Sequence, residues 1–285
     1  MNILITGCNG QLGNEMQLLE KAHPAHTFFN TDVDELDITN QEAVENFINT
    51  HEIEGIVNCA AFTAVDKAEE AKEPCTTLNT VAPAYLAAAI ESRHGWIIQI
   101  STDYVFNGKN FRPYREDDTP SPDGVYGSTK LAGEFGVTKF CSRAMIIRTA
   151  WLYSSFGNNF VKTMLRLGRE RDTLGVIYDQ IGTPTYARDL AMAIMSIIEQ
   201  GIHPGVYHFT NEGVASWYDF TKAIHRLAGI TGCQVRPLKT EEYPTPAKRP
   251  HYSILDKSKI KDTYHLTIPY WEDSLRECVE ILTSC

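Results

Sequence analysis

Short apolar runs alternate with segments of helical periodicity through the first half of the chain. Five of these runs predict strands, at residues 2–6, 27–31, 55–58, 96–101 and 144–149. Segments with helical spacing lie between them, for example at residues 82–93. This alternation is typical of a parallel sheet with helices on both faces, so the pattern predicts an α/β fold with a doubly wound parallel sheet.

One of these helices is expected to begin near residue 39. The sequence Thr39-Asn40-Gln41-Glu42 places a hydroxyl before the helix and a glutamate three residues later. In such a capping box the hydroxyl accepts a hydrogen bond from a free backbone N–H group, and the glutamate accepts one in return. We therefore expect Thr39 to cap this helix.

The alternation loosens after Arg148. Helical patterns, strand-like runs and a proline-containing loop follow one another at residues 159–171, 175–178, 188–200, 206–210, 217–228 and 242–250. We expect residues 151–285 to form mainly a smaller C-terminal lobe, with room for the chain to cross back to the first domain. Open α/β sheets bind ligands at the carboxyl ends of their strands, so this substrate-binding lobe should close over that edge.

Composition and charge narrow the class of protein. The 285 residues are 43% hydrophobic and 22% charged, as in ordinary globular proteins. The net charge of −10 argues against nucleic acid or an anionic membrane as the main partner, because binding to phosphates needs an excess of Lys and Arg. No run is long and apolar enough to cross a membrane.

The N-terminus and the cysteines favour a cytoplasmic protein. Met1 leads directly into the short apolar run Ile3-Leu4-Ile5, without the features of a signal peptide. The seven cysteines are an odd number, widely spaced and without a CxxC pair. This favours reduced thiols over disulfides or structural zinc.

A glycine-rich loop, GCNGQLG at residues 7–13, follows the first predicted strand and leads into a helical pattern. Glycines allow a tight turn and let a pyrophosphate approach the backbone at a helix N-terminus, where free N–H groups favour negative charge. Elsewhere such a motif would more often be an ordinary turn, but between a first strand and a first helix it favours a dinucleotide. We therefore interpret residues 1–150 as an NAD(P)-binding domain of Rossmann type.

Asp32 ends the second predicted strand, about 20 residues beyond the glycine loop, where an acidic side chain can bind the adenosine ribose. The alternative is a solvated acid in a loop that also contains Asp34, Glu35 and Asp37. A carboxylate would repel a 2′-phosphate, and no Arg adjoins it. This favours NADH over NADPH, and the sequence is compatible with either cofactor.

Three residues carry the candidate chemistry. Tyr126 and Lys130, at positions i and i+4 of a helical pattern, share one face. A neighbouring ammonium would favour the ionised phenol and lower its pKa from about 10. Such a pair often only covers a helix surface. Thr102, at the end of the fourth predicted strand, could bind a reacting carbonyl, and with the glycine loop it indicates a nicotinamide-dependent reductase.

At these motifs the chain resembles extended short-chain dehydrogenase/reductases, and more closely the dTDP-4-dehydrorhamnose reductase family. The similar segments extend over nearly the whole chain and read GCNGQLGNE (7–15), AAFTAVDKAE (60–69), STDYVFNG (101–108), YGSTKLAGE (126–134), RTAWLY (148–153), NFVKTMLRL (159–167) and DQIGTPT (179–185). The resemblance implies reduction of the C4 ketone of dTDP-4-dehydro-L-rhamnose by NADH or NADPH, giving dTDP-L-rhamnose.

The resemblance also implies roles for individual residues. Tyr126 would donate the proton, Lys130 would hold the nicotinamide ribose and tune Tyr126, and Thr102 would polarise the carbonyl. The cofactor would be bound by Gly7, Gly10, Gln11, Leu12, Gly13, Asp32, Asp37, Ile38, Ala61, Phe62 and Thr63. Asp103 and Trp151 would contact the sugar nucleotide, although a core aromatic is an equal alternative for Trp151. Arg249, beside Lys248, is our candidate for the diphosphate, with a solvated basic turn as the alternative.

Some members of this family hold Mg²⁺ with glutamates at a dimer interface. Glu15 matches one such ligand, but the next expected position is occupied by Arg188. A guanidinium offers no oxygen ligand and repels the ion, and the adjacent Asp189 could substitute only by pointing the other way. We therefore expect no metal, and a monomer or a homodimer built without it.

The sequence is also compatible with other functions. A related dehydratase would have Glu after the Thr-Asp pair, where this chain has Tyr104. An epimerase would use the same Tyr126 and Lys130 but retain its nicotinamide through the cycle. Some similar proteins are regulatory, nucleotide-binding subunits, an alternative that the complete set of Thr102, Tyr126 and Lys130 argues against.

Overall fold

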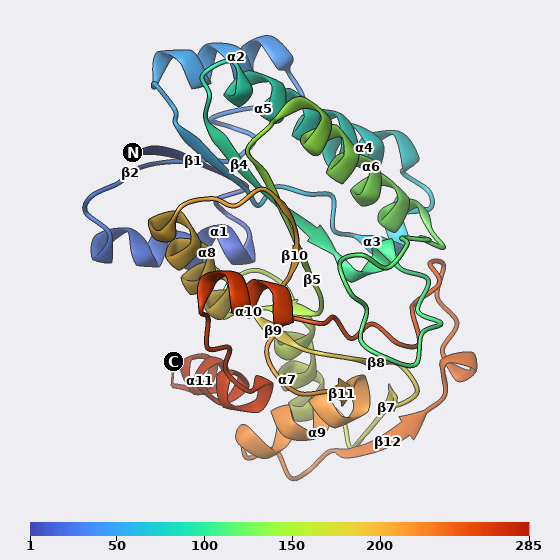
Figure 1. Ribbon diagram of the computed structural model, residues 1–285. Coiled ribbons are helices and arrows are strands. Elements are labelled where there is room, and N and C mark those ends of the chain that lie inside the picture. Colours follow the sequence, from blue (N-terminus) through green and yellow to red (C-terminus); the bar gives the residue numbers. More distant parts are fainter. Residues whose placement is uncertain (285) are drawn as a thin grey trace.

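The computed structural model describes residues 1–284, and their central element is a six-stranded parallel sheet (Figure 1). The strands, in the order β10-β5-β4-β3-β1-β2, are paired in parallel throughout. Their bounds are β1 (Asn2–Thr6), β2 (Thr27–Thr31), β3 (Gly55–Asn58), β4 (Trp96–Thr102), β5 (Ala144–Thr149) and β10 (Gly205–His208). The predicted α/β fold is confirmed, and β4 runs one residue further than expected.

Helices cover both faces of the sheet (Figure 1). One face is covered by α2 (Gln41–Thr50), α5 (Ala82–Glu91) and α6 (Val125–Phe140), and the other by α1 (Gln11–Leu19) and α8 (Ala187–Gln200). Successive residues of β1 face opposite sides: Leu4 packs with α2 and α5, whereas Ile3 and Ile5 pack with α1 and α8. Both faces are buried, which explains why the strands are apolar runs.

The start of α2 differs from the expectation. Its N-cap is Asn40, whose Oδ1 accepts a hydrogen bond from the Ala43 N–H group at 3.1 Å. The Thr39 hydroxyl donates instead to Asp37 at 2.6 Å. The capping box predicted at Thr39 is wrong, because the helix begins one residue later and Glu42 is then one position short of the reciprocal contact.

The second half of the chain contributes to two separate cores. The first, around the central sheet, receives α8 and β10, so the chain returns to the sheet after residue 150. The second is formed by elements that share an aromatic and aliphatic cluster, mainly β6 (Leu152–Tyr153), α7 (Phe160–Glu170), β7 (Thr173–Ile177), β9 (Thr185–Tyr186), β11 (Ala215–Ser216), α9 (Trp217–Leu227), β12 (Gln234–Leu238) and α11 (Trp271–Thr283). This half also contains β8 (Ile181–Gly182), α10 (Ser258–Tyr264) and a short 3-10 helix, Thr240–Glu242. Where the two domains divide stays a prediction.

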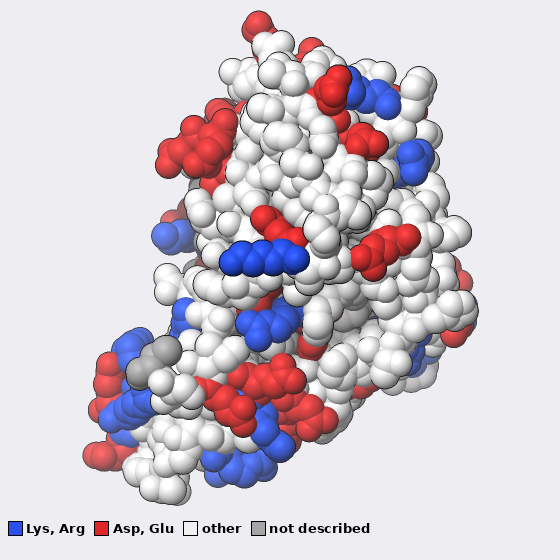
Figure 2. Space-filling view, turned by 90° about the vertical axis from the view of Figure 1, so that its left-hand side faces the viewer, with Lys and Arg blue, Asp and Glu red and all other residues white. Residues whose placement is uncertain are grey.

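The surface carries charges of both signs. On the face drawn in Figure 2, Lys and Arg are interspersed with Asp and Glu and do not gather into a single basic area. None of the helices within residues 1–284 is long and apolar enough to span a membrane. The six cysteines of this part of the chain are all free thiols.

Candidate active site

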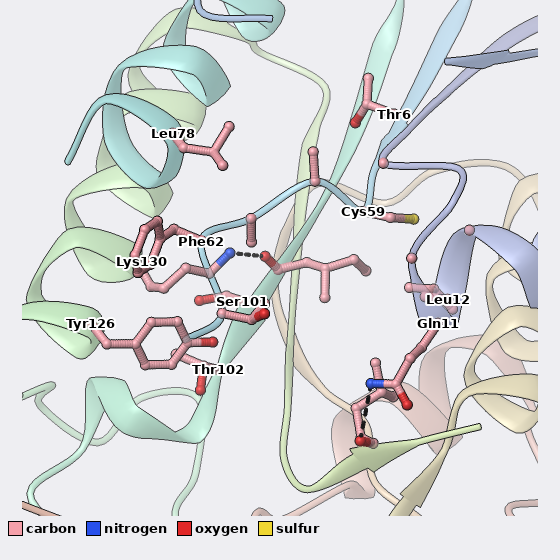
Figure 3. A pocket seen from close by; sticks show the side chains of 18 of the residues that line it. Thr6, Gln11, Leu12, Cys59, Phe62, Leu78, Ser101, Thr102, Tyr126 and Lys130 are labelled. Carbon is pink, nitrogen blue, oxygen red and sulfur yellow. Dashed lines mark hydrogen bonds between the residues drawn. The ribbon is translucent and has the colours of Figure 1, made fainter. Parts of the chain in front are cut away.

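A cavity of about 1120 Å³ opens at the carboxyl ends of the strands. It lies where the strand order reverses between β1 and β3, which is where open α/β sheets bind their ligands. It is lined by most of the residues proposed from the sequence, namely Gly7, Gly10, Gln11, Leu12, Gly13, Asp32, Asp37, Ile38, Ala61, Phe62, Thr63, Thr102, Asp103, Tyr126, Lys130 and Trp151. Figure 3 shows the side chains of several of them pointing into this cavity.

The glycine loop forms a backbone cradle at one end of the cavity. Gly7 has a φ of +64°, and a Cβ there would lie 2.8 Å from the Ala60 backbone. A Cβ on Gly13 would lie 2.4 Å from the Gly7 carbonyl oxygen. α1 begins at Gln11 without a side-chain cap among the described residues, which leaves N–H groups of its first turn for a ligand. These features fit a bound pyrophosphate.

Asp32 is held against this loop. Its carboxylate accepts hydrogen bonds from the N–H groups of Asn9 at 3.1 Å and Val33 at 2.9 Å. Asp37 lies further along the same wall, and its hydrogen bonds from Thr39 hold the pKa of its carboxyl below the ordinary value. Asp32 is therefore fixed at the wall of the cavity, where the ribose was expected.

Lys130 lies at the centre of the site. Its Nζ donates to the Ile100 carbonyl at 2.7 Å, a bond drawn in Figure 3. Burial lowers the pKa of Lys130 to about 8, and the nearby Glu134 carboxylate opposes this shift. Lys130 is therefore charged at neutral pH, and its ammonium is held beside the end of β4.

The Tyr126 phenol lies half-buried at the wall of the cavity and remains protonated at neutral pH. Burial raises its pKa above the ordinary value, and a hydrogen bond with Thr102 opposes the shift. The lowered pKa that we expected for Tyr126 is therefore wrong, because desolvation and the charge of Asp103 both raise it, and the Lys130 ammonium is directed to Ile100. A protonated phenol beside a hydroxyl is what a proton donor requires.

Asp103 adds a buried carboxyl next to these groups. Its Oδ1 accepts a hydrogen bond from the Thr102 hydroxyl at 3.0 Å, and its Oδ2 has no partner within residues 1–284. Burial raises the pKa of Asp103 to about 6, while hydrogen bonds with Ser253 and Thr102 oppose that rise. An acceptor without a partner at the wall of a cavity can accept a hydrogen bond from a hydroxyl group of a ligand.

Trp151 packs against other aromatic residues and also reaches the cavity, and its contact with the sugar nucleotide stays a prediction. Its ring stacks on Trp217 with centroids 3.5 Å apart and planes 10° from parallel, and it also lines the cavity. Its φ of +48° is unusual for a bulky residue, and such positions cluster at functional sites. Trp217, which the sequence did not single out, supports it from α9.

Arg249 lies beside the cavity and is not among the described residues that line it. Its guanidinium donates to the Asp66 carboxylate at 2.6 Å and to the Tyr104 hydroxyl at 3.1 Å. Tyr104 does line the cavity, and its ring meets Tyr126 edge-on with centroids 5.4 Å apart. The contact of Arg249 with a diphosphate stays a prediction.

A buried ion pair behind Lys130 was missed in the sequence. Glu134 accepts two hydrogen bonds from Arg148, at 2.9 and 2.7 Å, and a third from Ser101. Glu134 follows Lys130 by four residues, so the helical face of Tyr126 and Lys130 could have pointed to it. Its partner could not be read from the helix, because Arg148 lies in β5.

The groups around Glu15 do not fit a magnesium ion. The Glu15 carboxylate is fully buried and accepts hydrogen bonds from Ser154 at 2.6 Å and from the Arg188 guanidinium at 3.0 Å. Asp189 accepts instead from Asn211 and Ser274. With a guanidinium and a hydroxyl already against it, the Glu15 carboxylate is a poor ligand for Mg²⁺.

Comparisons with known proteins agree with this geometry. The family described as RmlD substrate binding domain matches residues 1–284. A dTDP-4-dehydrorhamnose reductase from Aggregatibacter actinomycetemcomitans is 39% identical over 96% of this chain and 97% of that protein. Among solved structures, a dTDP-4-dehydrorhamnose reductase from Clostridium acetobutylicum has a TM-score of 0.95 and 46% identity, covering 99% of each chain.

A second solved structure adds a bound cofactor. The dTDP-4-dehydrorhamnose reductase from Bacillus anthracis, in complex with NADP, has a TM-score of 0.93 and 38% identity, covering 97% of this chain and 98% of that one. These similarities extend over both halves of the chain rather than over the cofactor-binding half alone. The chain therefore belongs to the RmlD substrate binding domain family, and the resemblance to dTDP-4-dehydrorhamnose reductases that its motifs carry is confirmed.

Proposed function

We propose that this protein reduces the C4 ketone of dTDP-4-dehydro-L-rhamnose with NADH or NADPH, giving dTDP-L-rhamnose. One observation carries the proposal: a protonated Tyr126 phenol, the Thr102 hydroxyl and the Lys130 ammonium line the same cavity as the glycine cradle. The names of the similar proteins support the choice of substrate.

The residues that line the cavity have separate roles in this reaction. Residues 7–13 hold the pyrophosphate, Asp32, Asp37 and Ile38 the adenosine side, and residues 61–63 the part of the cofactor beside β3. The bound cofactor supplies the hydride. Thr102 donates a hydrogen bond to the ketone oxygen, Tyr126 transfers its proton to that oxygen, and Lys130 binds the nicotinamide ribose.

A carboxyl group, an aromatic ring and a guanidinium are the candidates for binding the sugar nucleotide. The Asp103 carboxyl accepts a hydrogen bond from the sugar, and the Trp151 face contacts the sugar nucleotide. Arg249 is the candidate for the diphosphate, which requires its guanidinium to exchange Asp66 or Tyr104 for the ligand. We place this reaction in the cytoplasm, in a monomer or a homodimer, with a nucleotide-linked sugar rather than nucleic acid or membrane as partner.

The experiment that tests the function is a coupled assay with several nucleotide-linked 4-keto sugars. Loss of the absorbance of NADH or NADPH, strongest with the dTDP-linked 6-deoxy-4-keto sugar, is expected. Binding of cofactor without turnover of any of these sugars would favour a regulatory subunit. Purification with tightly held NAD that does not exchange would favour an epimerase.

Asp32→Ala is expected to shift cofactor preference from NADH towards NADPH. The change removes a charged acceptor for the ribose hydroxyls and the repulsion of a 2′-phosphate, so the ratio of the two kcat/KM values should move by about ten-fold. Asp34→Ala, at an exposed acid of the same loop that does not line the cavity, is the matched control. An equal ratio in both variants would assign Asp32 to the solvated loop.

Exhaustive treatment with EDTA is expected to leave the activity unchanged. The reason is that Arg188 and Ser154 already satisfy the Glu15 carboxylate, which would otherwise be a ligand for the ion. Turnover before and after dialysis, with Mg²⁺ added back in a parallel sample, is the measurement. Activity that disappears and is restored by Mg²⁺ alone would show that a metal is bound by other ligands.

A further inference from the structure

A buried carboxylate lies one helical turn beyond the Lys130 ammonium. Glu134 follows Lys130 by four residues on α6, so the two side chains share one face of the helix. Both residues are almost completely buried. Burial of a charged side chain is costly unless an opposite charge compensates it. The reaction proposed above uses the ammonium and leaves the carboxylate without a role.

The Glu134 carboxylate joins three elements that meet at the cavity. The Arg148 guanidinium, on β5, donates to both of its oxygens, and the Ser101 hydroxyl, on β4, donates to Oε1. Ser101 and Arg148 are opposite one another in the register of β4 and β5. Ser101 lines the cavity and directly precedes Thr102. One carboxylate on α6 therefore fixes this helix against the end of β4 that carries Thr102.

The same end of β4 receives the ammonium. Lys130 Nζ donates to the carbonyl of Ile100, which is the residue before Ser101. Figure 3 shows this bond at the cavity, with the Ser101 side chain drawn close by. α6 is thus held to two adjacent residues of β4, once through its ammonium and once through its carboxylate. A shift of either contact moves the Tyr126 phenol, one turn earlier on α6, relative to Thr102.

The titratable groups around Lys130 come from several elements. They are the thiols of Cys59, after β3, and Cys75, in α4 (Lys72–Thr76), together with the Tyr126 phenol and the Glu134 carboxylate on α6. The Cys59 thiol is neutral because burial raises its pKa to about 12. The other buried carboxyl of the site, Asp103, accepts a hydrogen bond from Thr102. Burial lowers the pKa of Lys130, and among these groups Glu134 opposes that shift most.

We infer that Glu134 is a positioning residue, whose carboxylate keeps the Lys130 ammonium charged and holds α6 against the end of β4. This inference rests on the proposed function, because it takes Lys130 as the donor to the nicotinamide ribose. Charge-assisted hydrogen bonds are about twice as strong as neutral ones, so a neutral Lys130 would bind the ribose less well. Arg148 holds the carboxylate in place from β5.

The test compares Glu134→Gln with Arg148→Met. Both substitutions break the same buried ion pair, so both are expected to lower Tm. They differ in the charge that they leave beside Lys130, because the first removes the carboxylate and the second keeps it. The measurements are Tm, kcat and the Kd of NADPH and NADH between about pH 6.5 and 10. NADH is included because it has no 2′-phosphate that could itself titrate.

In the wild-type protein the cofactor Kd is expected to rise, and kcat to fall, as the pH rises through the Lys130 pKa of about 8. Glu134→Gln should move this transition down by about one pH unit, because an ammonium without its counter-ion loses its proton more easily. Arg148→Met should leave the transition in place or move it up. The double variant removes both buried charges and should show the downward shift even if a single variant does not fold.

Two outcomes would overturn the inference alone. The first is the wild-type pH dependence of the cofactor Kd in Glu134→Gln and in the double variant. The second is a downward shift of equal size in Arg148→Met, as a general loosening of the site would produce. Both leave the proposed function intact, since the wild-type chain still binds its cofactor and reduces the sugar. A wild-type chain that binds neither NADPH nor NADH would instead remove the proposed function, and the inference with it.

Discussion

Tyr126→Phe is expected to lower kcat by about 10²–10⁴-fold, the usual contribution of a positioned general acid. The phenyl ring preserves the edge-on packing against Tyr104, and only the proton and one hydrogen bond with Thr102 are lost. The Kd of NADH or NADPH should therefore stay near the wild-type value. Steady-state kinetics with the dTDP-linked keto sugar, together with cofactor titration, measure the two quantities separately.

The matched control for this variant is Tyr178→Phe, at a tyrosine that is well exposed and does not line the cavity within the described chain. It removes the same hydroxyl group from a position without a proposed role, so kcat should not change. A folded Tyr126→Phe protein with near-wild-type turnover would remove the phenol from the mechanism. Weakened cofactor binding in that variant would instead indicate a role in holding the nicotinamide.

Arg148→Met is expected to lower the free energy of unfolding by about 3–5 kcal/mol. The side chains of Arg148 and Glu134 are 4% and 5% exposed, and their paired hydrogen bonds join β5 to α6. Removal of the guanidinium leaves a buried carboxylate that keeps, among residues 1–284, the hydrogen bond from the Ser101 hydroxyl and the neighbouring charge of Lys130. A loss of this size is a large fraction of the 5–15 kcal/mol that stabilises a typical domain.

Denaturant titration measures this loss, with Arg166→Met as the control. Arg166 forms an ion pair with Glu170 on the exposed face of α7, where the two side chains are 59% and 52% exposed. Solvent screens such a pair, so its loss should change the free energy of unfolding by less than about 0.5 kcal/mol. Equal effects of the two substitutions would show that the buried pair does not contribute more than a surface one.

Pairs of residues that are far apart in the sequence illustrate what local patterns could not reveal. Asn79 supports Phe62 across 17 residues, and Arg249 reaches Asp66 across 183 residues. No periodicity or spacing predicts such contacts, because each depends on how two distant elements pack against one another. Arg249 was accordingly singled out for its charge, and the structure pairs that charge with Asp66 and Tyr104.

The sequence by itself determined the features that depend on neighbouring residues. The strands of the sheet, the glycine loop after β1 and the shared face of Tyr126 and Lys130 follow from short-range rules of periodicity and chirality. These rules also place Thr102 at the end of β4, because the carboxyl ends of parallel strands lie at one edge. The family could be recognised from these segments alone.

Only the tertiary structure decided the features that depend on burial and on distant partners. It brought β10 and α8 back to the central sheet, directed Lys130 to the Ile100 carbonyl and placed Arg188 against Glu15. It also determined the direction of the pKa shift of Tyr126, since desolvation is a property of the packed environment and not of the YxxxK spacing. A local pattern indicates which groups can lie close together. Their protonation and the hydrogen bonds that they have left for a ligand depend on the residues that the rest of the fold packs around them.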